Sequence, residues 1–235
     1  MQINPDSLPS SDDIDWNDID WDNGYWEEPS DHPSEYESLP RAVPVFFLIN
    51  AGNSMTGPII RAVNDAMKTT VDYLKIIKEE KHIYFYIFVM KISDQPEWDE
   101  SSLVPVENYQ WKDIKPCGKA DLNRAFKELN TRLSGLDHFG FPYFVLMPEI
   151  VFISTDSPDD RSSVSPDDGI KTLEKNLWFR SSERTTFVLG KPIDEDLTDN
   201  LIDIWFDSNN RYMLNEPDRL KEQMISIFSR YRELP

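Results

Sequence analysis

Polar side chains at the ends of two apolar segments are the residues of this chain best placed to do chemistry. The first segment, Val43–Ile49, is followed by Asn50 and Ser54, and the second, Ile150–Ser154, is followed by Asp156. An amide and a hydroxyl can both donate hydrogen bonds, whereas an ionised carboxylate only accepts them. Asn50 and Ser54 could therefore hold the carboxylate of Asp156, together with backbone N–H groups at the start of the helix that follows the first turn.

The remaining reactive side chains form no recognisable site. The three histidines (His32, His82 and His138) are far apart and lack the spacing of metal ligands. Cys117 has no base beside it in the sequence, which favours a structural thiol over a nucleophile. Two pairs of aspartates, at 159–160 and 167–168, could form a carboxylate pair, but solvated charge is the commoner role of such residues. The sequence has no glycine-rich phosphate loop or nucleophile elbow, so we expect neither catalytic residues nor a cofactor.

Hydrophobic spacing predicts the elements that would position the candidate residues. Continuous apolar runs indicate strands buried on both faces, and apolar residues at helical spacing indicate amphipathic helices. We expect strands at residues 43–49, 83–90, 150–154, 185–189 and 212–214, and a weaker edge strand within 104–114. We expect helices at residues 58–80, 122–133, 168–180, 194–206 and 217–230. Residues 135–148 contain two glycines and two prolines and predict an inserted loop or hairpin.

The alternation of strands and helices predicts an α/β fold with a doubly wound, mainly parallel central sheet flanked by helices. In such sheets functional loops gather at the carboxyl ends of the strands. The loops at residues 50–55 and 155–160 both lie at such ends. The candidate residues are therefore expected at one edge of the sheet.

The negative charge of the chain is concentrated in its first 40 residues. The chain has 235 residues, enough for one domain with a large core, and a formal net charge of −19. Residues 1–40 contain 12 of the 43 acidic residues and none of the 24 basic ones. We expect an acidic extension over residues 1–40, disordered or bound to a partner, and one domain over residues 41–235. No basic stripe is present to neutralise phosphates, which argues against direct nucleic-acid binding.

A five-residue repeat distinguishes this extension from an ordinary solvated tail. Residues 13–17 read DIDWN, residues 18–22 read DIDWD, and Trp26 follows at the same step. Tryptophan gains most when its large surface is buried, so the repeat predicts a segment that folds onto a partner. The residues expected to bind that partner are Asp13, Asp15, Trp16, Asp18, Asp20, Trp21 and Trp26. The alternative is a solvated tail that packs one tryptophan against its own domain.

Cysteine usage and hydropathy indicate a cytoplasmic protein. Cys117 is the only cysteine, so no internal disulfide can form and a reducing compartment is expected. The first residues, MQINPDSLPSSDD, lack the basic and then apolar order of a signal peptide. The longest apolar runs, at residues 43–49 and 83–90, are too short to span a bilayer, so we expect no membrane association.

Several short motifs, taken in their order and spacing, resemble those of von Willebrand factor A domains, most of all the bacterial tellurite-resistance-associated (TerY-type) branch. The resemblance covers about residues 41–232. Its carriers are PVFFLI at 44–49, SM at 54–55, GPI at 57–59, AVN at 62–64, GKADL at 118–122 and ISTDSPDD at 153–160. Family members have D-T-S-G-S-M-x-G, G-G-T-x-L and T-D-G-x-P-T-D in the corresponding loops. The resemblance implies the same doubly wound fold.

In this family, five residues from three loops hold a Mg²⁺ ion: an aspartate and two serines, then a threonine, then a second aspartate. The residues at these positions here are Asn50, Gly52, Ser54, Ala120 and Asp156. Only Ser54 and Asp156 keep the residue type of the family. Mg²⁺ demands near-ideal octahedral coordination by oxygen, so losing one carboxylate and two hydroxyls predicts a degenerate site that binds no metal.

A cationic side chain stands beside the second of these loops. Lys119 occupies a position where the family has glycine. Its ammonium group could lie near the vacated cation position and replace the charge of the ion. The alternative is a solvent-facing residue at the start of a helix.

The resemblance implies a non-enzymatic scaffold or regulator that binds another protein. Members of the TerY-type branch are associated with serine/threonine kinases and metal-dependent phosphatases in bacterial stress or defence modules. A second hypothesis is that the acidic extension imitates the phosphates of a nucleic acid and inhibits a basic nucleic-acid-binding protein. The third, an active metal-dependent enzyme, is opposed by the missing ligands.

Overall fold

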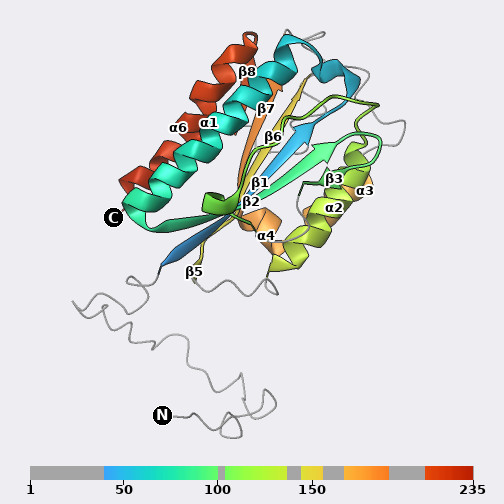
Figure 1. Ribbon diagram of the computed structural model, residues 1–235. Helices are drawn as coiled ribbons and strands as arrows, with labels where there is room; N and C mark the ends of the chain where they lie inside the picture. The colour runs from blue at the N-terminus through green and yellow to red at the C-terminus, as the bar shows by residue number, and fades with distance from the viewer. Residues whose placement is uncertain (1–39, 100–103, 137–143, 156–166, 191–209, 235) are drawn as a thin grey trace, which may run out of the picture. The chain divides into compact units, whose positions relative to one another are not determined.

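The apolar runs form the strands of one sheet, ordered β3-β2-β1-β6-β7-β8 (Figure 1). The computed structural model describes residues 40–99, 104–136, 144–155, 167–190 and 210–234. Residues 1–39 of the acidic extension and the helix expected at 194–206 lie outside these ranges. The division into an extension and a domain therefore stays a prediction.

The long strands run parallel to one another, as the alternation of strands and helices predicts. They are β1 (Arg41–Asn50), β2 (Ile83–Ile92), β6 (Glu149–Thr155), β7 (Glu183–Leu189) and β8 (Arg211–Leu214). The central strand β1 pairs with β2 on one side and with β6 on the other. Its side chains alternate between two apolar clusters: Val45 and Phe47 belong to one, and Phe46 and Leu48 to the other.

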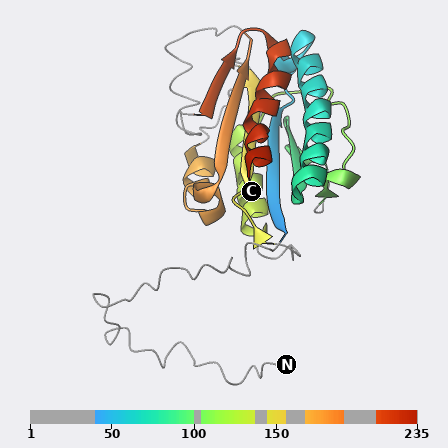
Figure 2. The ribbon, with the colours of Figure 1, turned by 90° about the vertical axis from the view of Figure 1, so that its left-hand side faces the viewer.

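Helices cover both faces of the sheet (Figures 1 and 2). On one face, α1 (Pro58–Lys81) and α6 (Leu220–Glu233) lie side by side. The other face carries α2 (Leu122–Ser134), α3 (Asp167–Leu173) and α4 (Leu177–Ser181). The fold is therefore the α/β architecture that the sequence predicts, with a mainly parallel sheet between two layers of helices.

Three short strands complete the sheet. β3 (Glu97–Trp98) and β4 (Val104–Pro105) are antiparallel to β2, and β5 (Phe144–Val145) is parallel to β1. β3 was not expected from the sequence, and the edge strand expected within residues 104–114 is only two residues long. A 3₁₀ turn follows Pro105. Ile114 is then held by the side chain of Asn64, which both donates to its carbonyl and accepts from its N–H, so these backbone groups bond to helix α1 and not to a strand.

The single helix expected at residues 168–180 is wrong, because the structure divides it into α3 and α4. Asn176 lies between the two helices, and its side-chain oxygen accepts a hydrogen bond from the N–H of Phe179 at 3.2 Å. An asparagine in this position caps a new helix and satisfies an N–H group that would otherwise lack a partner. The nitrogen of the same side chain donates to Asn130 and Ser134 of α2, which fixes the break against the neighbouring helix.

A cluster of polar side chains around the buried Glu149 fastens α6 to the amino end of the sheet. Glu149, the first residue of β6, is 1% exposed and accepts hydrogen bonds from Arg230 and Tyr231 of α6. Burial raises the pKa of the Glu149 carboxyl above its ordinary value, although the nearby Arg230 cation acts in the opposite direction. The same burial and the negative charge of Glu149 raise the pKa of the Tyr231 hydroxyl. Tyr231 is therefore a hydrogen-bond donor at every ordinary pH.

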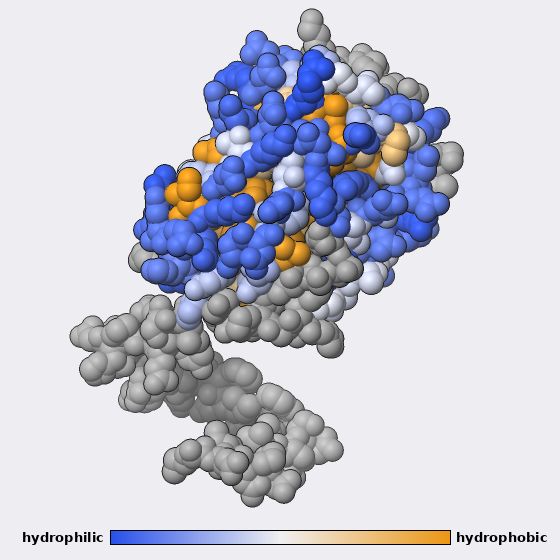
Figure 3. Space-filling model, in the orientation of Figure 1, coloured by the Kyte–Doolittle hydropathy of each residue, from blue (hydrophilic) through white to orange (hydrophobic). Residues whose placement is uncertain are grey.

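The outer surface of α1 and α6 is mostly hydrophilic, with separate small apolar patches (Figure 3). This polarity fits amphipathic helices that turn their apolar side toward the sheet. Among the helices that the structure describes, none is long and apolar enough to cross a membrane.

Candidate functional site

The side chain of Asn50 is built into the end of the central strand. Asn50 closes β1 and is completely buried. Its amide nitrogen donates to the hydroxyl of Ser154 at 3.0 Å, and its amide oxygen accepts from the N–H of Gly52 at 2.7 Å. Both ends of the amide are therefore used inside the protein. They fix the path of the chain as it leaves the strand.

These hydrogen bonds lie at the point where the strand order of the sheet reverses. From β1 the chain builds β2 on one side, and it later builds β6 on the other side. In open α/β sheets, the crevice at such a switch point is where ligands bind. Among the described residues, hydrogen bonds between side chains cross it: one from Asn50 to Ser154, and one in which the Thr155 hydroxyl donates to the Ser54 hydroxyl at 2.9 Å.

Backbone hydrogen bonds hold a second loop, residues 117–120, against the first loop, residues 50–55. The N–H of Cys117 donates to the carbonyl of Ala51 at 2.7 Å, and the N–H of Asn53 donates to the carbonyl of Gly118 at 3.0 Å. Gly118 has φ +66°, a conformation that suits glycine, and a Cβ there would lie 2.2 Å from Oδ2 of Asp94. The other carboxylate oxygen of Asp94 accepts from the N–H of Lys119 at 2.7 Å. The two loops thus form one surface at the carboxyl end of the sheet.

The two other candidate residues of the second loop have different environments. Ala120 is buried, with 2% exposure, and presents a methyl group where the resemblance implies a threonine hydroxyl. Lys119 is exposed, and its ammonium forms no salt bridge with any residue in the described ranges. Asp121 follows and caps α2 by accepting from the N–H of Arg124 at 3.0 Å.

The described residues do not fit a Mg²⁺ ion. Asn50 directs an N–H group at Ser154 where the family has a carboxylate, and its oxygen is already bonded to the N–H of Gly52. Gly52 and Ala120 have no side-chain oxygen, which leaves the hydroxyl of Ser54 as the one side chain of the expected type within the described part of the chain. Asp156 lies outside it. No group of three or more His, Cys, Asp or Glu side chains comes together among the residues that the structure describes.

Several other residues named from the sequence are dispersed or lie outside the described ranges. His82 ends helix α1 in a left-handed conformation, and Cys117 is exposed. Asp168 is exposed at the start of α3. The residues expected to bind a partner through the extension (Asp13, Asp15, Trp16, Asp18, Asp20, Trp21 and Trp26), together with His32, His138 and the Asp159–Asp160 pair, lie outside the described residues.

Sequence reasoning missed the residues that bond to the first and second loops. Ser154 and Thr155 end β6 and are the partners of Asn50 and Ser54. Asp94, beyond the end of β2, supports the turn at Gly118. One signal was present, since Ser154 and Thr155 directly precede Asp156, whose loop lies at the carboxyl end of a predicted strand. Nothing in the sequence alone pairs Asp94 with a glycine 24 positions later.

No protein-family model matches the sequence, and no curated protein matches it. Solved structures do. A von Willebrand factor type A protein from Catenulispora acidiphila is 10% identical, with a TM-score of 0.59 over 81% of this chain and 43% of that one. The ArnB paralog VWA2 from Sulfolobus acidocaldarius is 16% identical, with a TM-score of 0.52 over 78% and 44%. The pilus adhesin SpaC from Lactobacillus rhamnosus GG is 7% identical, with a TM-score of 0.61 over 81% and 30%.

These similarities show the fold. The helices, the parallel sheet and their order are those of von Willebrand factor A domains, as the sequence resemblance implied. This chain spans less than half the length of each of the three proteins.

Proposed function

We propose that this protein is a non-enzymatic protein–protein interaction module whose recognition surface is organised without a metal ion. That surface is the carboxyl end of the sheet, formed by the first and second loops. The observation that carries the proposal is the buried amide of Asn50, which bonds to Ser154 and Gly52 across the switch point of the sheet. Hydrogen bonds within the protein supply the rigidity that an ion supplies in intact sites of this family.

A preorganised surface lowers the free-energy cost of binding, because fewer groups must be ordered when the partner arrives. The loops meet this condition through backbone bonds from Cys117 to Ala51 and from Asn53 to Gly118. The side chains of Asn53, Thr56 and Lys119 are exposed on these loops and are available to a partner. Lys119 would attract a carboxylate there, which is the group that family members bind through the ion.

The resemblance to the TerY-type branch supports a particular class of partner. We propose a serine/threonine kinase or a metal-dependent phosphatase of a bacterial stress or tellurite-resistance module, with this protein as scaffold or regulator in the cytoplasm. The acidic extension would add affinity through Trp16, Trp21 and Trp26. Its carboxylates would mainly speed the encounter with a basic surface and make it sensitive to salt.

Metal independence can be tested by calorimetric titration of the full chain with Mg²⁺ and Mn²⁺ at millimolar concentration. We expect no saturable heat, both for the parent and for Ser54→Ala. A saturable, site-dependent signal in the parent that disappears in Ser54→Ala would overturn the proposal.

The interaction itself can be tested by affinity capture from the native host in the presence of EDTA, followed by mass spectrometry and direct binding to the purified partner. The parent should retain a kinase or phosphatase, whereas Asn53→Ala with Lys119→Ala should bind it at least about tenfold more weakly, as loss of an interface hot spot does. Lys171→Ala, an exposed lysine of α3, is the matched control and should bind like the parent. Trp16→Ala with Trp21→Ala should chiefly raise the dissociation rate.

The outcomes separate the rival hypotheses. A basic nucleic-acid-binding protein, captured through the extension and insensitive to the loop substitutions, would support the phosphate-mimic hypothesis instead. Turnover of a substrate by the purified chain would contradict a non-enzymatic role.

A further inference from the structure

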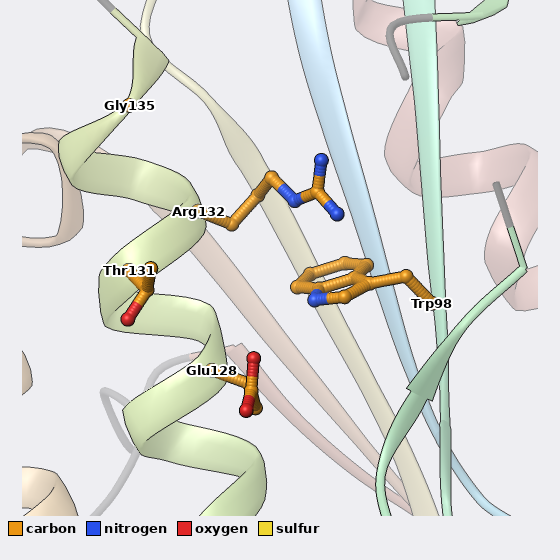
Figure 4. Close-up of a pocket in the computed structure, with 5 residues that line it drawn as sticks. All are labelled: Trp98, Glu128, Thr131, Arg132 and Gly135. Carbon is orange, nitrogen blue, oxygen red and sulfur yellow. The ribbon is translucent and has the colours of Figure 1, made fainter. Parts of the chain in front are cut away.

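A pocket of about 240 Å³ lies between the edge strand β3 and helix α2. It is lined by Trp98 from β3, by Glu128, Thr131 and Arg132 from α2, and by Gly135, which follows α2 (Figure 4). None of the candidate residues at the carboxyl end of the sheet contributes to it. It is therefore a separate feature of the surface.

The wall formed by Trp98 is rigid. Its ring meets Phe46 edge to face, with centroids 6.1 Å apart and planes at 72°, and meets Phe88 in the same way at 6.5 Å and 79°. Phe46 and Phe88 stack on each other in the core with centroids 4.5 Å apart. The indole is thus held by the core of the domain, so a ligand would find it already in place.

Arg132 extends from α2 over this indole (Figure 4). Its guanidinium carbon lies 4.8 Å from the centre of the Trp98 ring, within the range of a cation–π contact. Burial lowers the pKa of Arg132, while the negative charge of Glu128 opposes the shift. A partly desolvated planar cation beside an anchored indole is a stronger binding surface than either group in water.

The size and residue types of the pocket indicate which ligand fits. Pockets for small molecules and cofactors commonly have about 300–1,000 Å³, so this one has room for a single side chain. Tryptophan and arginine are also the residue types that dominate the energetics of protein interfaces. Glu128 adds an acceptor to the pocket, and its carboxylate is close enough for its negative charge to act on the Arg132 guanidinium.

We propose that this pocket binds one tryptophan side chain of a partner protein. The incoming ring stacks on the guanidinium of Arg132, and its N–H donates to the carboxylate of Glu128. Phenylalanine would give the same stacking but leave Glu128 without a donor, and leucine offers no π face to the cation. The indole N–H can only donate, so it is complementary to a carboxylate acceptor. This site goes beyond the proposed recognition surface and does not depend on it.

The test uses N-acetyl-tryptophanamide as the probe, titrated into the isotope-labelled full chain and followed by the NMR signals of the Trp98 indole N–H and the Arg132 side chain. N-acetyl-phenylalaninamide and N-acetyl-leucinamide serve as comparison probes. We expect saturable shifts with the tryptophan probe, weaker binding of the phenylalanine probe and no saturable shift with the leucine probe.

Three substitutions on helix α2 separate the contribution of the Glu128 carboxylate to probe binding from that of the Arg132 guanidinium. Glu128→Gln should weaken the tryptophan probe about fivefold, the effect of a charged hydrogen-bond acceptor, and should leave the phenylalanine probe unchanged. Arg132→Lys keeps the charge but loses the planar face, and should weaken both aromatic probes. Lys127→Gln, an exposed residue of α2 outside the pocket, is the matched control and should alter neither.

The proposal is overturned if the tryptophan probe gives no saturable shift, if the leucine probe binds equally well, or if Lys127→Gln weakens binding as much as Glu128→Gln. Asn53→Ala with Lys119→Ala should leave probe binding intact. A loss of partner capture in that variant would therefore bear on the proposed function alone.

Discussion

Asn50 and Glu149 are both buried polar residues on neighbouring strands, but they stabilise the domain under different conditions. Asn50 is uncharged, and both ends of its amide are hydrogen-bonded, so its burial costs little at any pH. Glu149 places a titratable carboxyl group in the same interior, so the cost of burying it depends on whether the group is protonated. Its hydrogen bonds from Arg230 and Tyr231 offset only part of the cost of burying its charge.

This difference makes the effect of Glu149 on stability depend on pH. Because burial raises the pKa of Glu149 above its ordinary value of 4.5, the folded protein holds this proton more tightly than the unfolded chain does. The resulting stabilisation is fully present below that ordinary value and is lost as pH rises through the folded pKa. We expect the unfolding free energy of the parent, minus that of Glu149→Gln, to decrease as pH rises from about 4 to 7.

Urea denaturation of both proteins across this pH range measures the difference. Glu174→Gln is the control, since Glu174 is an exposed glutamate that follows α3 and takes no part in this cluster. A difference that increases with pH would show that the Arg230 cation dominates over burial.

At the scale of elements, the turn at Gly118 positions the second loop against the first. Gly57 and Gly118 share a positive φ, +70° and +66°, so alanine is strained at both. They differ in space, because nothing lies within 4 Å of a Cβ at Gly57, whereas a Cβ at Gly118 would overlap the Asp94 carboxylate. We expect Gly57→Ala to cost about 1–3 kcal/mol, because its φ of +70° and ψ of −127° form a sparsely populated backbone conformation. Gly118→Ala should cost about 1–3 kcal/mol from overpacking in addition to its own backbone strain.

Thermal and chemical denaturation of the two variants compare these costs directly. Asp94→Ala in the Gly118→Ala background should recover part of the difference, since it removes the overlapping side chain at the expense of the hydrogen bond to the Lys119 N–H. Failure of Asp94→Ala to recover any stability in the Gly118→Ala background would show that the Asp94 side chain moves aside freely.

The elements that the sequence predicted well are those that are long enough for their own apolar pattern to define them. β1, α1 and β2 are long, and their apolar pattern is unambiguous. β3 was missed because two residues carry no periodicity, and Glu97 and Trp98 pair only because the edge of β2 is open beside them. The apolar spacing on both sides of Asn176 is continuous and predicts one helix. The chain forms two helices instead, because the Asn176 side chain caps the start of the second one.

The candidate site was predictable as a set of positions and not as a set of contacts. The sequence placed Asn50, Gly52 and Ser54 at the end of a strand, which the structure confirms. The bond between Asn50 and Ser154 depends on the register of β1 and β6, in which Ile49 lies opposite Ile153. That register is a property of the assembled sheet, and a local pattern does not contain it.

At the scale of the whole molecule, described residues between positions 42 and 231 already form an apolar cluster on each face of the sheet, and residues 1–40 contain few aliphatic side chains. We therefore expect deletion of residues 1–40 to lower the melting temperature by no more than about 2 °C and to preserve a single cooperative transition. Circular dichroism with calorimetry measures both quantities. A broad or much lower transition would show that the extension contributes to the folded core.

The direction of α6 has a practical consequence for any measurement on a solid support. The helix runs toward the amino end of the sheet, where the side chain of Lys81, the last residue of α1, donates to the carbonyl of Leu234 at 2.8 Å. β1 also begins at that end, at Arg41. A biotin or affinity tag joined after Leu234 would therefore attach the domain to the support at the amino end of the sheet and leave the loops around Asn50 facing the bulk solution. An orientation of this kind leaves soluble analytes free access to those loops.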